Sequence, residues 1–183
     1  MAEEKTNLRV LLTSEQIAKR VKELARQISE DYRGKTLYAV CVLENGFIFM
    51  ADLVRHIDVP VVCQFMKPMF SEMTQGSSST TEIFFTPEPN VKQHDVLLIE
   101  GLVQSGVTSE FLMRMMLARG ATSVKLAAFL DKQKERRVSL QPDYFGFLID
   151  ESYVVGYGLG SPHVGRNLPY VASGVPNPAA AAK

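Results

Sequence analysis

The sequence predicts a single α/β domain over residues 1–183, in which helices flank a parallel central sheet. Runs of apolar residues typical of buried strands lie at 37–43, 61–65, 96–99 and 124–130. Segments with helical periodicity separate most of these runs, and the third run leads through a Ser/Gly turn directly into a helix. Alternating strands and helices form parallel sheets, whose ligands bind at the carboxyl ends of the strands. The turns at those ends are therefore the candidate sites.

An amphipathic helix is predicted near the start of the chain. Thr13 is a favourable N-cap residue, and Gln16 stands three positions later, which is the spacing of a capping box. Apolar residues then recur at steps of three and four, at Ile17, Val21, Leu24 and Ile28. This pattern predicts a helix with one buried face that ends near Tyr32, before Gly34.

A strand, a helix and a second strand are expected next. The strand at 37–43 is interrupted by Glu44-Asn45-Gly46, and 47–56 follows as a helix. Asp58-Val59-Pro60 stops that helix before the β-rich run at 61–65.

Residues 67–81 differ in composition from the segments around them. They contain Pro, Gly and the cluster SSSTT, which predicts a long, polar, mobile loop. A solvated hairpin connection is the plainer alternative. Residues 83–86 are expected to return from this segment as a strand.

The second half of the chain continues the alternation. After the strand at 96–99, a turn at 101–107 leads into a helix at 108–119, which Gly120 stops. One face of this helix is expected to carry Phe111, Leu112, Met115 and Met116. A strand at 124–130, a charged turn at 131–137 and short strands at 144–149 and 153–157 complete the list of expected elements.

Composition limits the function classes. Apolar residues make up 46% and charged residues 22% of the chain, and 20 Lys plus Arg balance 20 Asp plus Glu. Zero net charge gives no reason to expect binding to nucleic acid or to an anionic membrane surface. Cys41 and Cys63 lie in apolar runs and are expected to be buried, reduced thiols. Without a signal-peptide pattern the expected location is cytoplasmic, with a flexible tail at 174–183.

Residues 96–111, VLLIEGLVQSGVTSEF, give the strongest indication of a binding site. Such a turn can direct backbone N–H groups and the hydroxyls of Ser105 and Thr108 at one phosphate, with support from the helix dipole. Strand-turn-helix connections without a ligand are also common. The residues alone leave a purely structural turn as an equal alternative.

This segment resembles the phosphoribosyl-pyrophosphate motif of the purine phosphoribosyltransferases. Four further stretches resemble the hypoxanthine-guanine branch of that family: LLTSEQIAKRVKELARQIS, FMADLVRHIDVPV, FLDKQKERR, and PDYFGFLIDESYVVGYGL followed by GRNLPYV. The resemblance covers roughly residues 8–172. It implies the type I phosphoribosyltransferase fold, with a small hood built from both chain ends, and a role in purine salvage.

Ribose and phosphate contacts are implied at the motif itself. Glu100 would accept hydrogen bonds from the ribose hydroxyls, with Gly101 beside it. The 5′-phosphate would lie in a cradle formed by Ser105, Gly106, Val107 and Thr108.

Purine and pyrophosphate contacts are implied at three other loops. Lys132 would contact the exocyclic oxygen of a 6-oxopurine, Tyr153 would stack on the ring, and Val154 would offer backbone groups to the base edge. Pyrophosphate would lie against Glu44, Asn45, Gly46 and Arg166. Without the resemblance, Lys132 and Arg166 are more typical of solvated surface charges.

The resemblance breaks at the residues expected to carry the chemistry. Gly101 replaces the second acidic residue of the motif, Gln104 replaces the Asp that acts as the base, and Gly160 replaces an Asp that helps to hold Mg²⁺. Glu44 stands where the family often has Lys, and the Ser-Tyr pair of the long loop is not recognisable in KPMFSEMTQG. Weak or absent Mg²⁺ binding is therefore expected.

Two function hypotheses remain. The favoured one is a catalytically impaired relative that binds a purine nucleotide, or phosphoribosyl pyrophosphate, as a homodimer or homotetramer or beside an active paralogue. The alternative is an active transferase that makes IMP or GMP with an altered site. Restoring Asp at 101, 104 and 160 together is expected to raise activity, because these positions lie in otherwise matching loops. Metal-dependent hydrolysis by His56, His94 and His163 is disfavoured, because the three lack ligand spacing.

Overall fold

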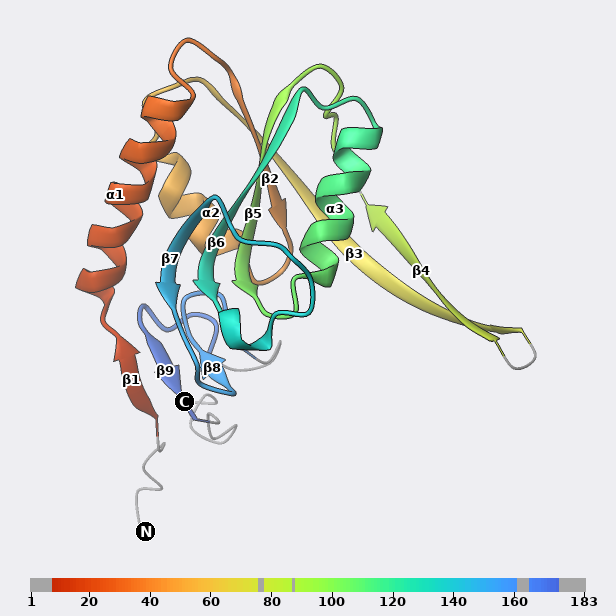
Figure 1. Ribbon diagram of the computed structural model, residues 1–183. Helices are drawn as coiled ribbons and strands as arrows, with labels where there is room; N and C mark the ends of the chain where they lie inside the picture. The colour runs from red at the N-terminus through yellow and green to blue at the C-terminus, as the bar shows by residue number, and fades with distance from the viewer. Residues whose placement is uncertain (1–7, 76–77, 87, 161–164, 175–183) are drawn as a thin grey trace.

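The structure is a computed structural model that describes residues 8–75, 78–86, 88–160 and 165–174. Its central sheet has six strands in the order β4-β3-β2-β5-β6-β7 (Figure 1). These strands are β2 (Leu37–Val42), β3 (Val61–Gln75), β4 (Ser78–Thr86), β5 (Asp95–Val103), β6 (Ser123–Asp131) and β7 (Tyr144–Leu148). All neighbours pair in parallel except β3 and β4. The α/β prediction is confirmed, with β5 inside the sheet between β2 and β6.

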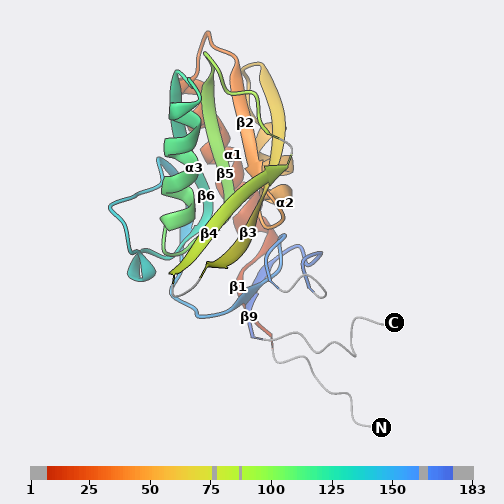
Figure 2. The same cartoon turned by 90° about the vertical axis from the view of Figure 1, so that its right-hand side faces the viewer.

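Helices cover both faces of this sheet (Figures 1 and 2). The helices α1 (Ser14–Asp31) and α2 (Phe47–Val54) pack on one face, and α3 (Val107–Ala118) packs on the other. Successive side chains of β5 enter opposite layers, since strand residues alternate between faces. Leu97 belongs to the core under α1 and α2, whereas Leu98 belongs to the core under α3.

The predicted capping box of α1 is present. The Thr13 side chain accepts a hydrogen bond from the Gln16 backbone N–H at 3.3 Å, and the Gln16 side chain accepts one from the Thr13 N–H at 2.8 Å. The four apolar residues predicted for the inner face are buried. No helix in the described ranges is long and apolar enough to cross a membrane.

A small second sheet forms the expected hood from both ends of the chain. It has the antiparallel order β1-β9-β8, with β1 (Arg9–Leu12), β8 (Val154–Val155) and β9 (Val171–Ser173). Figure 1 shows this hood facing the carboxyl ends of β5, β6 and β7. The strand expected at 153–157 is shorter, because it pairs with β9 only at Val154 and Val155.

The prediction of a long loop at 67–81 is wrong, and its alternative, a hairpin connection, is confirmed. Strands β3 and β4 pair antiparallel from Lys67↔Thr86 to Gln75↔Ser78, and the hairpin projects from the body of the domain (Figure 1). The strand expected at 83–86 is confirmed as part of β4. The Ser/Thr cluster suggested a loop, but threonine and the neighbouring aromatic residues favour extended backbone once a partner strand is present.

Two burial predictions are also wrong. Cys63 is exposed, because β4 pairs with β3 only from Lys67 onward, so that residues 61–65 form the edge of the sheet and most of them are not covered. Cys41, in a central strand, is buried as expected, and burial raises the pKa of its thiol to about 12. Phe111 is 42% exposed, so the buried face of α3 consists of Ser109, Leu112 and Met116 instead.

Candidate active site

A cavity of about 320 Å³ lies at the carboxyl ends of the central strands, next to the hood. Its described lining residues are Asn45, Leu102, Gln104, Lys132, Ser152, Tyr153, Val154, Leu159 and Gly160. Six of the positions singled out in the sequence therefore meet here, because parallel strands bring their C-terminal loops to one edge. Leu102, Leu159 and Ser152 were not predicted, since the two leucines look like core residues and a lone serine carries no specific signal.

One wall of the cavity carries the residues implied for purine binding. Lys132 is only 1% exposed, so it is not a solvated surface charge. Its Nζ donates to the Glu135 carboxylate and to the Ser152 carbonyl oxygen, both at 3.1 Å. Tyr153 is 38% exposed and directly precedes β8, whose first residue, Val154, is buried. The arrangement offers a cation, an aromatic face and backbone groups to one planar ligand.

The turn that was predicted to bind the 5′-phosphate is shorter than expected. Strand β5 runs through Gly101 to Val103, so the turn consists of residues 104–106, and α3 begins at Val107. Gly106 is the N-cap residue and has φ +76°, a left-handed conformation that glycine adopts without strain. Ser105 Oγ accepts a long hydrogen bond of 3.4 Å from the Val107 N–H. The first turn of α3 thus leaves backbone N–H groups for an anion.

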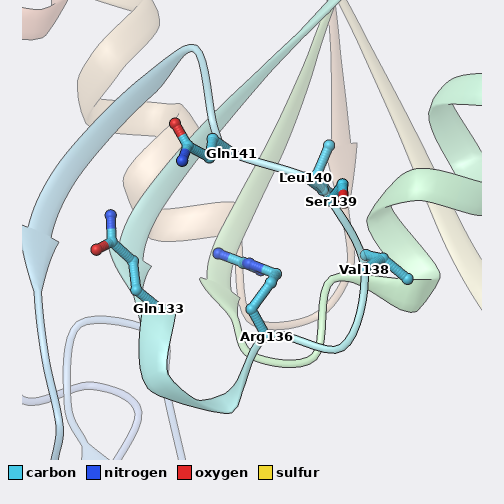
Figure 3. A pocket seen from close by; sticks show the side chains of 6 residues that line it. All are labelled: Gln133, Arg136, Val138, Ser139, Leu140 and Gln141. Carbon is cyan, nitrogen blue, oxygen red and sulfur yellow. The ribbon is translucent and has the colours of Figure 1, made fainter.

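Arg136 holds this turn from the β6–β7 connection, which sequence reasoning treated only as a charged turn. Its guanidinium donates to the Gln104 carbonyl oxygen at 3.0 Å and forms an ion pair with the buried Asp131. The Arg137 N–H donates to the Ser105 carbonyl oxygen at 2.9 Å. A second cavity, of about 550 Å³, follows the same connection (Figure 3), lined by Gln133, Arg136, Val138, Ser139, Leu140 and Gln141.

Glu100, which precedes Gly101 in β5, is a buried carboxylate at 8% exposure and is not among the described residues that line the cavity. Its Oε1 atom has no hydrogen-bond partner among the residues that the structure describes. Burial raises the pKa of Glu100 to about 7, although a hydrogen bond from Ser109 and the charge of Arg136 act in the opposite direction. A ligand hydroxyl that donates to this oxygen would satisfy it.

The two glycines at expected carboxylate positions leave no room for a side chain. A Cβ atom on Gly101 would lie 2.2 Å from the Asn45 carbonyl oxygen. Gly160 has φ +106°, and its Cβ would lie 2.9 Å from Val155 Cγ2. The expectation that Asp fits at 101 and 160 is therefore wrong for this backbone, because the loops have closed over the glycines.

The pyrophosphate loop brings a negative charge to the edge of the site. The Leu43–Glu44 peptide bond is cis, and Gly46 is the N-cap residue of α2. Glu44 forms ion pairs with Lys67 at 2.8 Å and with Arg166 at 3.6 Å. The hydrogen bond from Lys67, and then the charges of Lys67 and Arg166, hold the pKa of Glu44 below its usual value.

The cavity lining includes no Asp or Glu among the described residues. Magnesium prefers carboxylates together with substrate phosphates, and Gly101 and Gly160 offer only backbone oxygens. No group of three His, Cys, Asp or Glu in the described ranges has the geometry for a metal ion. Of the three histidines, His94 stacks on Tyr38 with ring centroids 3.6 Å apart, and His163 lies outside the described residues. The residues present do not fit a magnesium ion held by protein carboxylates.

Comparisons with known proteins agree with this geometry. The phosphoribosyl transferase domain family matches residues 9–161. The hypoxanthine-guanine phosphoribosyltransferase of Bacillus subtilis is 36% identical over 171 residues, which cover 93% of this chain and 94% of that enzyme. The solved hypoxanthine-guanine phosphoribosyltransferase of Bacillus anthracis, with a HEPES molecule in its active site, has a TM-score of 0.78 at 33% identity and covers 90% of this chain and 95% of its own.

A third relative is the hypoxanthine phosphoribosyltransferase of Staphylococcus aureus, whose structure has a TM-score of 0.81 at 34% identity. The similarity covers 96% of this chain and 94% of that one. These relatives share more than 30% of their residues with this chain, and the similarity extends along nearly its whole length. This chain belongs to the hypoxanthine-guanine phosphoribosyltransferase family.

Proposed function

We propose that this purine-salvage homologue binds a purine nucleoside 5′-monophosphate and has little or no transferase activity. One observation carries the proposal. The described lining of the cavity combines Lys132, Tyr153 and Val154 with Gln104 and Gly160, and it contains no Asp or Glu. The groups suited to holding a nucleotide are there, and the carboxylates suited to the chemistry are not.

Nucleotide binding is supported by three separate parts of the site. The turn at 104–106 ends at Gly106, the N-cap residue of α3, and a phosphate bound there would face the backbone N–H groups of the first helical turn. Glu100 has a buried oxygen that lacks a hydrogen-bond donor, which suits a ribose hydroxyl. Lys132 is buried beside Tyr153, which suits a purine with an oxygen at position 6.

Loss of catalysis is supported by the residues that replace the expected acids. In the family, those acids transfer a proton and help to hold Mg²⁺. Glutamine at 104 cannot accept a proton near neutral pH, and general-base catalysis contributes about 10²–10⁴-fold. Gly101 and Gly160 cannot carry carboxylates without displacing the loops that contact them. Mg²⁺, which would stabilise charge on departing pyrophosphate, finds few protein ligands here, so we propose weak or absent binding.

An active transferase that makes IMP or GMP is the second candidate. One observation favours it: the pKa of Glu100 is raised to about 7, so this carboxylate can accept and release a proton near neutral pH. The similar proteins of the two Bacillus species are also named as ordinary hypoxanthine-guanine phosphoribosyltransferases.

Calorimetric titration with IMP and GMP tests the binding half of the proposal. Binding should be measurable, and the double variant Ser105→Ala with Thr108→Ala should weaken it by roughly tenfold or more, since hydrogen bonds to charged groups contribute about 1.5–3 kcal/mol. Thr122→Ala, at an exposed position near the amino end of β6, is the matched control and should bind as the wild type does. No binding at millimolar nucleotide would reject the proposal.

Assembly and location belong to the same proposal. We propose a cytoplasmic homodimer or homotetramer, or a complex with an active paralogue. Light scattering on the purified chain, alone and mixed with such a paralogue, measures the mass. A monomer under both conditions would contradict this part.

A further inference from the structure

The Glu44 carboxylate lies between two cations that come from distant parts of the chain. Lys67 stands at the base of the β3–β4 hairpin and donates to Glu44 Oε1 at 2.8 Å. Arg166 comes from the segment before β9, and its Nη1 lies 3.6 Å from Glu44 Oε2. Both carboxylate oxygens thus face a positive charge.

The backbone around Glu44 is fixed by close contacts. Two glycines pack closely against the Asn45 carbonyl oxygen. A Cβ atom on Gly101 would lie 2.2 Å from this oxygen, and a Cβ atom on Gly158 would lie 3.1 Å from it. Arg166 is held as well, because its Nη1 donates to the Gly158 carbonyl oxygen at 3.3 Å and its own carbonyl oxygen accepts from the Gly158 N–H at 2.8 Å. Glu44 is therefore held beside the cavity that Asn45 lines.

A carboxylate in this position acts on an incoming anion in two ways. It occupies a hydrogen-bond donor of Lys67 and offsets part of the positive charge of Arg166, and a phosphate group would need both. It also repels a multiply charged anion. In water this repulsion is worth up to about fivefold in affinity per added charge at about 4 Å, before salt screens it. A single phosphate on the turn at 104–106 is bound by other groups, from β5 and α3.

We propose that Glu44 is a built-in anion at the pyrophosphate position, so that the site accepts purine 5′-monophosphates and discriminates against pyrophosphate and phosphoribosyl pyrophosphate. The inference rests on the proposed function, because it assigns the turn at 104–106 to the 5′-phosphate. It adds the residue that determines whether the site binds a monophosphate or a pyrophosphate group.

The test compares the wild type with Glu44→Gln, which keeps the side-chain shape and removes the charge. Glu88→Gln is the matched control, since Glu88 forms an exposed ion pair with Arg119, the C-cap residue of α3. Each protein is titrated with IMP and with sodium pyrophosphate, with and without magnesium chloride, and thermal unfolding checks that each is folded.

Glu44→Gln should bind pyrophosphate about tenfold or more tightly than the wild type, while its affinity for IMP stays within about twofold. Glu88→Gln should match the wild type for both ligands. Equal pyrophosphate affinity in the wild type and Glu44→Gln, whether strong or undetectable, would overturn the inference. Gained pyrophosphate binding in Glu44→Gln without IMP binding in any variant would keep Glu44 as the anion that excludes pyrophosphate and would reject the proposed nucleotide function.

Discussion

Replacing Glu100 by Gln tests whether the buried Glu100 carboxylate lowers the stability of the domain when it is ionised, and whether a bound nucleotide offsets that loss. Glu100 is nearly inaccessible, and its Oε1 atom lacks a partner within the described residues. Glutamine has almost the same shape but cannot ionise. The substitution therefore removes the charge and keeps the packing between β5 and α3.

The size of the effect follows from the pKa of the carboxyl group. Burial raises the pKa of Glu100 from 4.5 to about 7, so the folded chain binds this proton more tightly than the unfolded chain does. The free energy of unfolding should consequently fall as the pH rises from about 4.5 to about 7, by up to about 3 kcal/mol at roughly 1.4 kcal/mol per pH unit. Glu100→Gln lacks this loss, so it should match the wild type near pH 5 and exceed its stability above pH 7.

Urea unfolding between about pH 5 and pH 8.5 measures this difference directly. Glu88→Gln, which removes an exposed carboxylate, serves as the control and should keep the wild-type slope. Saturating IMP should stabilise the wild type, and it should stabilise Glu100→Gln less, because the ribose hydroxyl then meets no carboxylate. Parallel pH profiles for the wild type and Glu100→Gln would refute the reasoning.

Three further substitutions probe the packing and the purine wall of the site. Gly101→Ala should destabilise the domain by about 1–3 kcal/mol, because its Cβ would overlap the Asn45 carbonyl group; an unchanged melting temperature would contradict this. Lys132→Met should weaken IMP binding by roughly 10- to 100-fold and AMP binding much less, since only IMP carries the 6-oxygen; equal losses for both nucleotides would exclude the assigned contact. Arg136→Met should cost about 3–5 kcal/mol of stability in urea unfolding, because the buried Asp131 loses its cation; a change below about 1 kcal/mol would argue against the ion pair.

The parallel sheet and the location of the candidate site could be predicted because local patterns and topology agree there. The strand at 96–99, the Ser/Gly turn and the helix after it each have a strong local signal, and β5 lies inside the sheet as expected. Lys132 and Tyr153, which are far from this turn in sequence, lie near it because parallel strands end at one edge.

Features that depend on loop packing could not be predicted. Gly101 looked like a missing carboxylate in an open turn, but it lies in β5 under the Asn45 carbonyl group, and only the folded loop reveals that contact. The ion pairs of Glu44 with Lys67 and Arg166 also join segments with no local relation. The length of the β3–β4 pairing could not be predicted for the same reason, since the pairing stabilises residues whose composition suggests a loop.

The central claim is that the chain holds a purine nucleotide but does not make one. The direct measurement is a coupled assay for IMP and GMP formation from hypoxanthine or guanine, phosphoribosyl pyrophosphate and Mg²⁺, run with the same preparation that is titrated with IMP. The account predicts measurable IMP binding and turnover far below the ordinary range of about 1–10³ s⁻¹. A wild-type rate within that range would contradict the account, and it would mean that Glu100 and water suffice for the steps assigned to the missing carboxylates.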